Sequence, residues 1–561
     1  AGRSPSSLAV AGGALWIGDE AGQVRRLDGA AGGVSDSIST GSSPVGLASF
    51  DDELWVIAAP PAVAHRGGTL RVAADEFQID PAGFSDEYGV SELAYDGLVR
   101  YNRAPGAAGV RLAPGLAVDV PEPSDGGRRY VFRLARGLRY SDGTPLRAAD
   151  VRASFERSIA NLPADGVSGL DAVVGVERCG GAATACDLSA GVVTDERSRT
   201  VEIRLRHPDP SFLANLALPS GAVLPATTPR HAVERPIPGT GPYRVAQITR
   251  GRRVVLVRNP HFRPSEDGAR RAGFADRVEV TMRSDDRWRI AAVERGALDL
   301  APFRLHSREI AGLRARFGSR LWSGSFQSTM YAWLNVREPP FNDRRVRRAL
   351  SLAVDRRRAV EVFGGPDFGT PTCQLLPPGL PGYRPLCTST ADPSPAGAWT
   401  ASDRWRARAM TAGSAVRGTR VEVWVKPEWR SLGQHVADVL RDLGFRGRVR
   451  VFDDLGPLLE AAQDPREHPQ IGLVGWVADS PEPANFLRPL VGCEARRPDR
   501  GGFNLSGFCD RGIDAAIDRA EAAGLNAGPA WHRIERRLDV QMPVIPLLNA
   551  RYPVVVSKRL G

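Results

Sequence analysis

The fold of this chain is decided by the stretch Phe132-Arg133-Leu134, Gly137, Ser141-Asp142-Gly143-Thr144-Pro145-Leu146 and Ala149-Asp150-Val151. It leads into a helical pattern from Ala148 to Ser158. On either side, β-runs such as Leu70-Arg71-Val72-Ala73 and Val201-Glu202-Ile203-Arg204-Leu205 alternate with helical patterns such as Arg344 to Val360. The sequence therefore predicts a mixed α/β fold.

One helix can be placed closely, after Pro340. Asn342 is its expected N-cap, and its apolar stripe at three- and four-residue spacing consists of Val346, Ala349, Leu350 and Ala353. A second amphipathic helix is predicted from Arg511 to Ala523.

Several ordered motifs carry a family resemblance. Besides the opening stretch, they are Leu93-Ala94-Tyr95-Asp96-Gly97-Leu98-Val99, Gly239-Thr240-Gly241-Pro242-Tyr243, Asn259-Pro260, Asn335, Pro340-Phe341, Asp343, Val346-Arg347, Ala349-Leu350, Ala353 and Asp355. From about Gly67 to Gly561 the chain resembles the family 5 extracellular solute-binding proteins, which include oligopeptide-, dipeptide- and nickel-binding proteins of ABC importers.

This resemblance implies a two-lobed periplasmic-binding-protein fold of type II (cluster C) with an extra domain. We expect the first lobe at 69–275, with the extra domain inserted at about 97–195, the second lobe at 276–540, and a return to the first lobe at 541–561. A ligand enclosed between the lobes contacts both and so favours the closed state. The closed complex is then presented to a membrane permease.

The segment Gly475-Trp476-Val477-Ala478-Asp479-Ser480-Pro481-Glu482-Pro483 resembles the ligand-binding stretch of oligopeptide-binding proteins. The resemblance implies that Asp479 pairs with the ligand's α-ammonium and that Trp476 walls a side-chain pocket. Gly475 and Val477 would offer backbone groups to the peptide main chain. The alternative is that Asp479 is a turn residue bonded to its own backbone.

Two aromatic residues, Tyr331 and Trp333, lie in a strand that borders the cleft in this family, and alternation puts them on one face. They are candidate ligand contacts, with packing in the core as the alternative. Trp424 and Trp429 have less support, and Phe84 to Tyr88 is a loose candidate for the first lobe's cleft lining.

An internal repeat opens the chain. Six residues, Gly2, Pro5, Leu8, Ala9, Leu15 and Trp16, recur at an offset of 39 as Gly41, Pro44, Leu47, Ala48, Leu54 and Trp55. A period near 40 with a Leu-Trp pair is typical of β-propeller blades, so residues 1–57 are interpreted as a partial propeller, against chance recurrence. One and a half blades cannot bury their faces, so we expect more blades upstream. Residues 58–68, rich in Pro and Gly, form the expected linker.

Six cysteines lie in three close couples, Cys179 and Cys186, Cys373 and Cys387, and Cys493 and Cys509. Short loops close most easily, which favours three sequential disulfides over the other connectivities or six unrelated thiols. Disulfides place the protein in an oxidising compartment outside the cytoplasm.

The charge distribution and the absence of certain motifs argue against a nucleic-acid-binding protein, a membrane-spanning protein and an enzyme. The net charge of +10 comes almost entirely from arginine, since only Lys426 and Lys558 are lysines, and the arginines are interleaved with acids rather than gathered into a nucleic-acid face. No run of about eighteen apolar residues suggests a membrane span. No P-loop, G-x-S-x-G elbow or HExxH motif is present. We therefore expect no enzymatic activity, cofactor or metal, and a monomer.

Two functions fit these observations. The first is capture of a short peptide or related solute outside the cytoplasm for an ABC permease, with a membrane tether in upstream sequence. The second is ligand sensing within a larger propeller-containing regulatory protein.

Overall fold

The structure is a computed structural model of the 561-residue chain. It describes residues 5–11, 14–19, 23–27, 34–39, 44–50, 53–58, 66–75, 79–82, 90–102, 109–161, 169–179, 186–265, 270–303, 307–413, 417–496 and 502–560. The chain divides into two compact units, Ala1–Gly68 and Thr69–Gly561.

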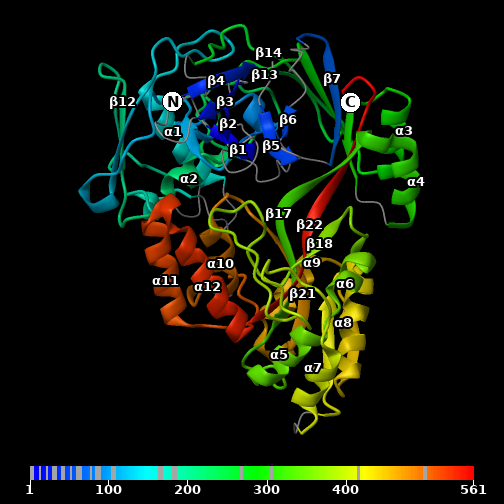
Figure 1. The fold of residues 1–561 in the computed structure, drawn as a ribbon. Helices are drawn as coiled ribbons and strands as arrows, with labels where there is room; N and C mark the ends of the chain where they lie inside the picture. Colours follow the sequence, from blue (N-terminus) through cyan, green and yellow to red (C-terminus); the bar gives the residue numbers. More distant parts are fainter. Residues whose placement is uncertain are drawn as a thin grey trace. The chain divides into compact units, whose positions relative to one another are not determined.

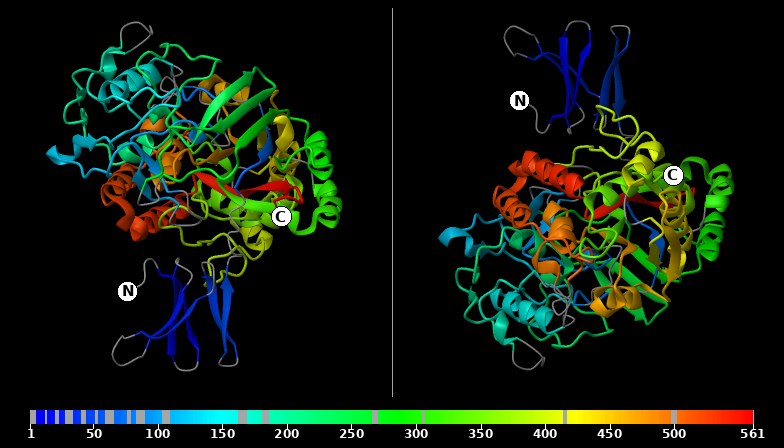
Figure 2. Two further views of the ribbon diagram at one scale, coloured as in Figure 1. Left: turned by 90° about the horizontal axis from the view of Figure 1, so that it is seen from above. Right: turned by 90° about the horizontal axis from the view of Figure 1, so that it is seen from below.

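The first unit is a small antiparallel β-structure (Figure 2). A four-stranded sheet is formed in chain order by β1 (Pro5–Ala11), β2 (Ala14–Asp19), β3 (Gln23–Leu27) and β4 (Val34–Ser39), and a hairpin by β5 (Pro44–Phe50) and β6 (Glu53–Ala58). Strands β5 and β6 begin 39 residues after β1 and β2. The sequence repeat is therefore a repeated β-hairpin.

One sheet of 11 strands organises the second unit (Figure 1). Its order is β13-β14-β15-β7-β16-β22-β17-β21-β19-β20, with β18 paired to β22. The strands are β7 (Thr69–Ala74), β13 (Tyr243–Thr249), β14 (Arg253–Arg258), β15 (Arg277–Met282), β16 (Leu300–Pro302), β17 (Leu321–Leu334), β18 (Gly369–Pro371), β19 (Arg420–Val425), β20 (Arg446–Val451), β21 (Ile471–Val477) and β22 (Val544–Val556).

The long strands β17 and β22 run through both parts of this unit (Figure 1). We call the part around β7 and β13–β16 the first lobe and the part around β19–β21 the second lobe. The antiparallel register of β17 with β22 breaks between Ser325 and Thr329, and Asn549 Nδ2 donates a hydrogen bond to Thr329 Oγ1 (2.9 Å) just beyond the break. Bulges bend strands, and this break lies where the two strands pass from one lobe to the other.

The opening stretch of sequence folds within the first lobe. Strand β10 (Arg129–Arg133) pairs with β12 (Thr200–Arg204), which pairs with β11 (Val192–Asp195), and helix α1 (Ala148–Ala160) packs beside them. In the turn between β10 and α1, Tyr140 Oη donates to Asp150 Oδ2 (3.0 Å), which also accepts from Arg147 N (2.8 Å). The Asp-Gly-Thr-Pro tract is thus a turn that delivers the chain into a capped helix.

Five further strands and α-helices are described in the first lobe. They are β8 (Val99–Tyr101), β9 (Leu112–Pro114), α2 (Phe212–Leu216), α3 (Asp286–Glu294) and α4 (Ser307–Phe317).

Among the described residues, eight α-helices surround the second lobe's part of the sheet. They are α5 (Arg344–Ala353), α6 (Arg356–Phe363), α7 (Arg404–Thr411), α8 (Arg430–Asp442), α9 (Leu455–Gln463), α10 (Pro483–Val491), α11 (Arg511–Ala522) and α12 (Gly528–Gln541). Apolar side chains of α5, α6 and α8 bury one face, and those of α9 to α12 bury the other. Both faces are covered, as expected for an α/β sheet.

The helical pattern from Arg344 to Val360 differs from the prediction in two respects. It forms two helices, because Val354 is extended and Asp355 starts α6 by accepting from Arg358 N (2.9 Å). The N-cap of α5 is Asp343, not Asn342, and its carboxylate accepts from Arg345 N (2.7 Å). Asn342 and Asp343 are adjacent and both residue types are favoured N-caps, so the sequence alone did not decide which of them caps α5.

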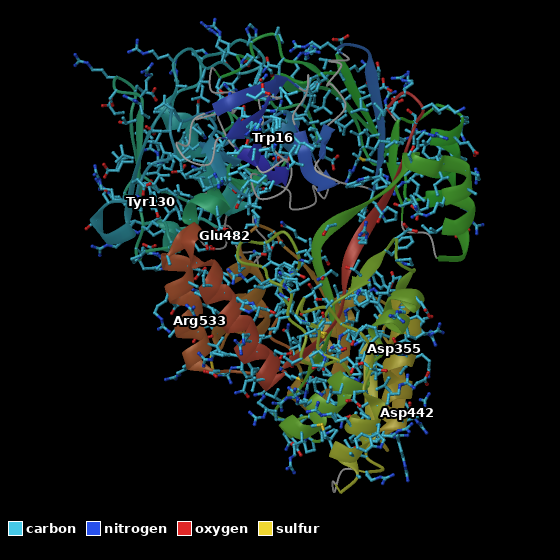
Figure 3. The ribbon with its side chains drawn as sticks, viewed as in Figure 1. Trp16, Tyr130, Asp355, Asp442, Glu482 and Arg533 are labelled. Atoms are coloured by element: carbon cyan, nitrogen blue, oxygen red, sulfur yellow. A yellow bond between two sulfur atoms is a disulfide. The ribbon has the colours of Figure 1, made fainter. Side chains whose placement is uncertain are left out.

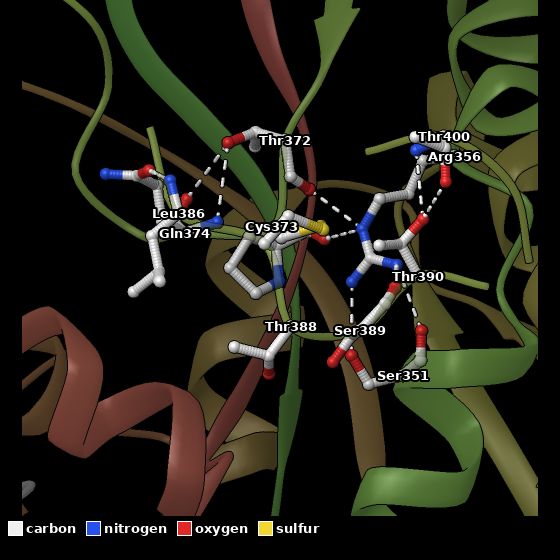
Figure 4. The surroundings of a disulfide bond; sticks show 12 residues. Ser351, Arg356, Thr372, Cys373, Gln374, Leu386, Thr388, Ser389, Thr390 and Thr400 are labelled. Carbon is white, nitrogen blue, oxygen red and sulfur yellow. Dashed lines mark hydrogen bonds between the residues drawn. A yellow bond between two sulfur atoms is a disulfide. The ribbon is translucent and has the colours of Figure 1, made fainter. Parts of the chain in front are cut away.

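The three close cysteine couples are disulfide-bonded: Cys179 with Cys186, Cys373 with Cys387, and Cys493 with Cys509. The second bond closes a loop beside the buried Arg356 (Figure 4). The Arg356 guanidinium donates to the carbonyls of Thr372 (2.8 Å), Pro546 (2.9 Å) and Ser351 (2.9 Å), which ties this loop to β22 and α5.

Candidate functional site

Strand β21, which carries Gly475, Trp476 and Val477, has one open edge. It pairs with β17 along its whole length, from Ile471 opposite Leu334 to Val477 opposite Ser328. With β19 only two of its residues pair, Ile471 and Gly472. Within the described part of the chain, the edge of β21 from residue 473 to 477 therefore has no strand partner on the side of β19.

Gly475 and Val477 direct their backbone groups to this open edge. Ala478 N donates to Gln327 O on the β17 side (2.9 Å), and in an antiparallel pair the residues that bond across alternate along the strand. The backbone groups of Trp476 therefore point toward β17, like those of Ala478. The backbone groups of its two neighbours, Gly475 and Val477, point to the opposite side. Their N–H and C=O groups are placed to pair with an added extended chain.

Asp479 lies in the turn between β21 and α10 and is bonded reciprocally to Asn485. Its backbone N–H donates to Asn485 Oδ1 (3.0 Å), and its Oδ2 accepts from Asn485 Nδ2 (3.2 Å). Desolvation raises the pKa of the Asp479 carboxyl, and Asn485 lowers it in part. The residue is nevertheless exposed. Such a carboxylate gains from pairing with a cation.

Trp476 is half-buried and held by the same residue, since its Nε1 donates to Asn485 O (3.0 Å). Its ring packs edge-on against Phe503, with the ring centroids 5.1 Å apart. Asn485 therefore orients both side chains that the sequence assigned to ligand binding, and Phe503 extends the apolar surface beside the open edge.

Tyr331 and Trp333 lie in the core of the second lobe, 3% and 1% exposed. Trp333 packs edge-on against Trp424, which is also buried. The structure thus places all three in the packing role that the sequence left open. Trp429 lies at the start of α8, 4.4 Å from the ammonium of Lys426. Phe84 to Tyr88 lies outside the described residues.

Residues from both lobes that the sequence analysis did not single out meet next to Asp479. Ser211, just before α2 in the first lobe, donates to Glu521 Oε1 on α11 (3.2 Å). Tyr101, at the end of β8, lies beside the hydroxyl of Ser480 and the carboxyl of Glu482. Figure 3 labels Glu482 between the first lobe and α11. No sequence signal joins these positions, because they are brought together only by the fold.

Two carboxyl groups near this contact, those of Glu482 and Asp209, have raised pKa values. Burial, with help from Glu521 and Asp209, raises the pKa of Glu482 to about 7. Burial also raises the pKa of Asp209.

Across the described ranges, no three His, Cys, Asp or Glu side chains are grouped so that they could hold a metal ion. In the same ranges, no helix has the length and apolar character needed to cross a membrane.

A two-lobed α/β fold with an open strand edge beside a carboxylate and an aromatic side chain is that of a solute-binding protein. Residues 111–497 match the bacterial extracellular solute-binding proteins, family 5 Middle, and the chain belongs to this family. Its members bind solutes and are not enzymes. The fold is accordingly that of the periplasmic binding proteins.

Individual relatives are distant in sequence but match over most of their length. Di/tripeptide-binding protein 2 of Pseudomonas aeruginosa is 26% identical over 536 residues, covering 88% of this chain and 92% of the relative. The dipeptide-binding protein of Escherichia coli is 25% identical over 472 residues, covering 79% and 82%. The solved structure of clavulanic acid biosynthesis oligopeptide binding protein 2 superposes with a TM-score of 0.74 at 27% identity, covering 88% and 92%.

Proposed function

We propose that this protein captures short peptides with a free N-terminus and delivers them to an ABC importer in the membrane. The observation that carries the proposal is the open edge of β21 beside Asp479. An extended peptide added to this edge forms main-chain hydrogen bonds with Gly475 and Val477, which give affinity without side-chain selectivity.

Asp479 sets the position of such a peptide. Asn485 bonds both the backbone N–H and the carboxylate of Asp479, so the carboxylate is already ordered for bonding to an ammonium. A charge-assisted hydrogen bond of this kind is stronger than a neutral one. The side chain of Trp476, in β21, and the ring of Phe503 that packs against it can contact a ligand side chain. The names of the two curated relatives, a di/tripeptide- and a dipeptide-binding protein, support the same ligand class.

Native mass spectrometry of the full chain tests this function. The protein is offered a pool of di- to tetrapeptides, alongside Asp479→Asn and the matched control Asp119→Asn, an exposed aspartate of the first lobe. We expect peptide adducts on the wild type and on the control, and a strong loss of adducts in Asp479→Asn. Absence of peptide adducts on the wild-type protein would contradict the proposal.

We also propose the setting of this function. The family supports an ABC permease as the membrane partner and a place outside the cytoplasm, where we propose that the protein acts as a monomer. The three disulfides fit an oxidising compartment. The expected lobes, 69–275 with an extra domain at about 97–195, and 276–540 with 541–561 returning to the first lobe, are proposed with one change. Residues 276–317, which carry β15, β16, α3 and α4, belong to the first lobe, because β15 and β16 pair with β7.

A sensing role is the second candidate, favoured by the first unit. Its repeated β-hairpin, with an offset of 39 residues, fits the start of a β-propeller in 1–57 joined by the linker 58–68. In that case the binding lobes would report a ligand to a larger protein. Sequencing of the parent gene decides between transport and sensing, because a signalling or DNA-binding domain encoded upstream would favour sensing.

A further inference from the structure

Helix α12 presents arginine side chains to solvent on one side. Residues three and four positions apart share one side of a helix, and the exposed ones on this side are Arg533, Arg536, Arg537 and Val540. Arg537 pairs with Asp510 (3.3 Å). Arg533, which Figure 3 labels, and Arg536 form no ion pair among the described residues.

The start of α5 extends this surface beyond the end of α12 (Figure 1). Arg347 joins the two helices, because its guanidinium donates from Nη2 to Gln541 O (2.7 Å). Beside it, Arg344 and Arg345 are exposed and Arg348 is half-buried. In the described ranges these three arginines form no ion pair.

Arg384 adds a sixth unpaired arginine, from the loop between β18 and α7, and is exposed. Burial lowers the pKa of His532 on α12, and the positive charges of Arg384 and Arg536 lower it further, so these side chains lie close together. We define the basic face as the six unpaired arginines Arg344, Arg345, Arg348, Arg384, Arg533 and Arg536.

The acidic side chains nearby do not neutralise the basic face. Asp343 caps α5, and Asp539 accepts from the Thr388 hydroxyl (2.5 Å). Glu535 is buried, 3% exposed, and accepts from backbone N–H groups. Along the chain the acids of α12 lie among its arginines, but the helix turns them toward the protein. The six guanidinium groups therefore outnumber the two acids at this surface, Asp343 and Asp539.

The chemistry of the basic face fits lipid phosphates. A guanidinium binds a phosphate through two N–H groups at once, so a surface of unpaired arginines matches an array of phosphates. Each arginine near an anionic membrane strengthens binding about fivefold. The large apolar side chain exposed on α12 is Val540 (52%), which can enter the lipid interface, rather than an aromatic ring that could stack on a nucleic-acid base.

We propose that the basic face docks the second lobe on an anionic membrane surface by binding lipid phosphates. This docking goes beyond peptide capture and does not depend on it. Together with the proposed function, it would hold the binding lobes at the membrane in which the permease lies.

Co-sedimentation of the full chain with lipid vesicles tests the docking. Vesicles of phosphatidylcholine alone are compared with vesicles in which half of the lipid is phosphatidylglycerol. We expect the wild type to bind the anionic vesicles only, and to be released at about 1 M NaCl, where the Debye length is about 3 Å. Replacement of Arg344, Arg345, Arg533 and Arg536 together by Gln should weaken binding several hundredfold, at about fivefold for each arginine.

The control variant loses the same number of positive charges elsewhere and should bind like the wild type. It replaces four exposed arginines of the first lobe by Gln, namely Arg111, Arg133, Arg136 and Arg197. Equal weakening of both variants would overturn the proposal, because the net charge of +10 would then explain the binding. Equal binding of the wild type to both kinds of vesicle would overturn it too, as would binding to duplex DNA but not to vesicles.

Circular dichroism checks that both variants are folded, and native mass spectrometry checks that they still take up peptides like the wild type. Vesicle binding that needs the basic face, in a wild-type protein that shows no peptide adducts, would support the docking and refute only the proposed function.

Discussion

At the scale of single residues, Asn485 is the point on which the site depends. It bonds the backbone and the carboxylate of Asp479 and accepts from the Trp476 indole. An asparagine can do this because its side chain has both a donor and an acceptor. The sequence pointed to Asp479 and Trp476 through a family resemblance, but it gave no sign that one residue on α10 orients both.

Replacement of Asn485 by Ala should raise the pKa of Asp479 further, because Asn485 is what lowers it. Peptide affinity requires the carboxylate and is lost as pH falls through that pKa, so the loss should begin at a higher pH in the variant. At neutral pH we expect affinity to fall about tenfold, the value of one lost hydrogen bond to a charged group. Calorimetric titrations from pH 4 to 8 measure both effects. If the pH profiles of affinity for the wild type and the variant have the same shape and differ only by a constant factor, Asn485 has no role in positioning the carboxylate.

At the scale of elements, buried polar side chains fasten irregular loops to the regular frame. Arg356 holds the loop of the Cys373–Cys387 disulfide from one side, as Figure 4 shows. From α12, the carboxyl group of Glu535 accepts from Leu375 N and Leu376 N (both 3.1 Å). Buried backbone groups need such partners, which explains why polar side chains lie inside an apolar lobe.

Glu535 makes stability depend on pH. Burial raises its pKa to about 8, so the folded state holds the proton more tightly than the unfolded chain. Its contribution to stability is present below about pH 4.5 and is lost as pH rises through 8, by up to about 1.4 kcal/mol per pH unit. Chemical denaturation at pH 5.5, 7 and 8.5 should show a smaller decline for Glu535→Gln than for the wild type. If the unfolding free energies of the wild type and of Glu535→Gln change with pH in parallel, Glu535 is not the titrating group.

The Cys493–Cys509 disulfide closes the loop that carries Phe503 toward Trp476. Its removal in the double Ser variant should cost about 3 kcal/mol of unfolding free energy, as expected for a loop of this length. Because the loop also positions Phe503, affinity for peptides with large apolar side chains should fall more than affinity for Ala-Ala. Equal losses for both peptides would mean that the loop serves stability alone.

At the scale of the whole molecule, the sequence predicted the α/β class and the family, because both rest on ordered local motifs such as the turn around Asp142. It was less informative where tertiary packing decides. Arg344 to Val360 was read as one pattern, although capping by Asp355 starts a second helix. Alternation put Tyr331 and Trp333 on one face but could not tell core from cleft. The contact of Ser211 with Glu521 joins residues 310 positions apart and leaves no local signal.

The central claim is that a peptide is held by its ammonium at Asp479, and one titration tests it most directly. A tripeptide that binds the wild type is compared with its N-acetylated form, which keeps the backbone and side chains but lacks the charge. We predict that acetylation weakens binding to the wild type about 100-fold, the cost of a lost buried charge pair of about 3 kcal/mol. In Asp479→Asn the two forms should bind almost equally. Equal binding of both forms by the wild-type protein would contradict the account.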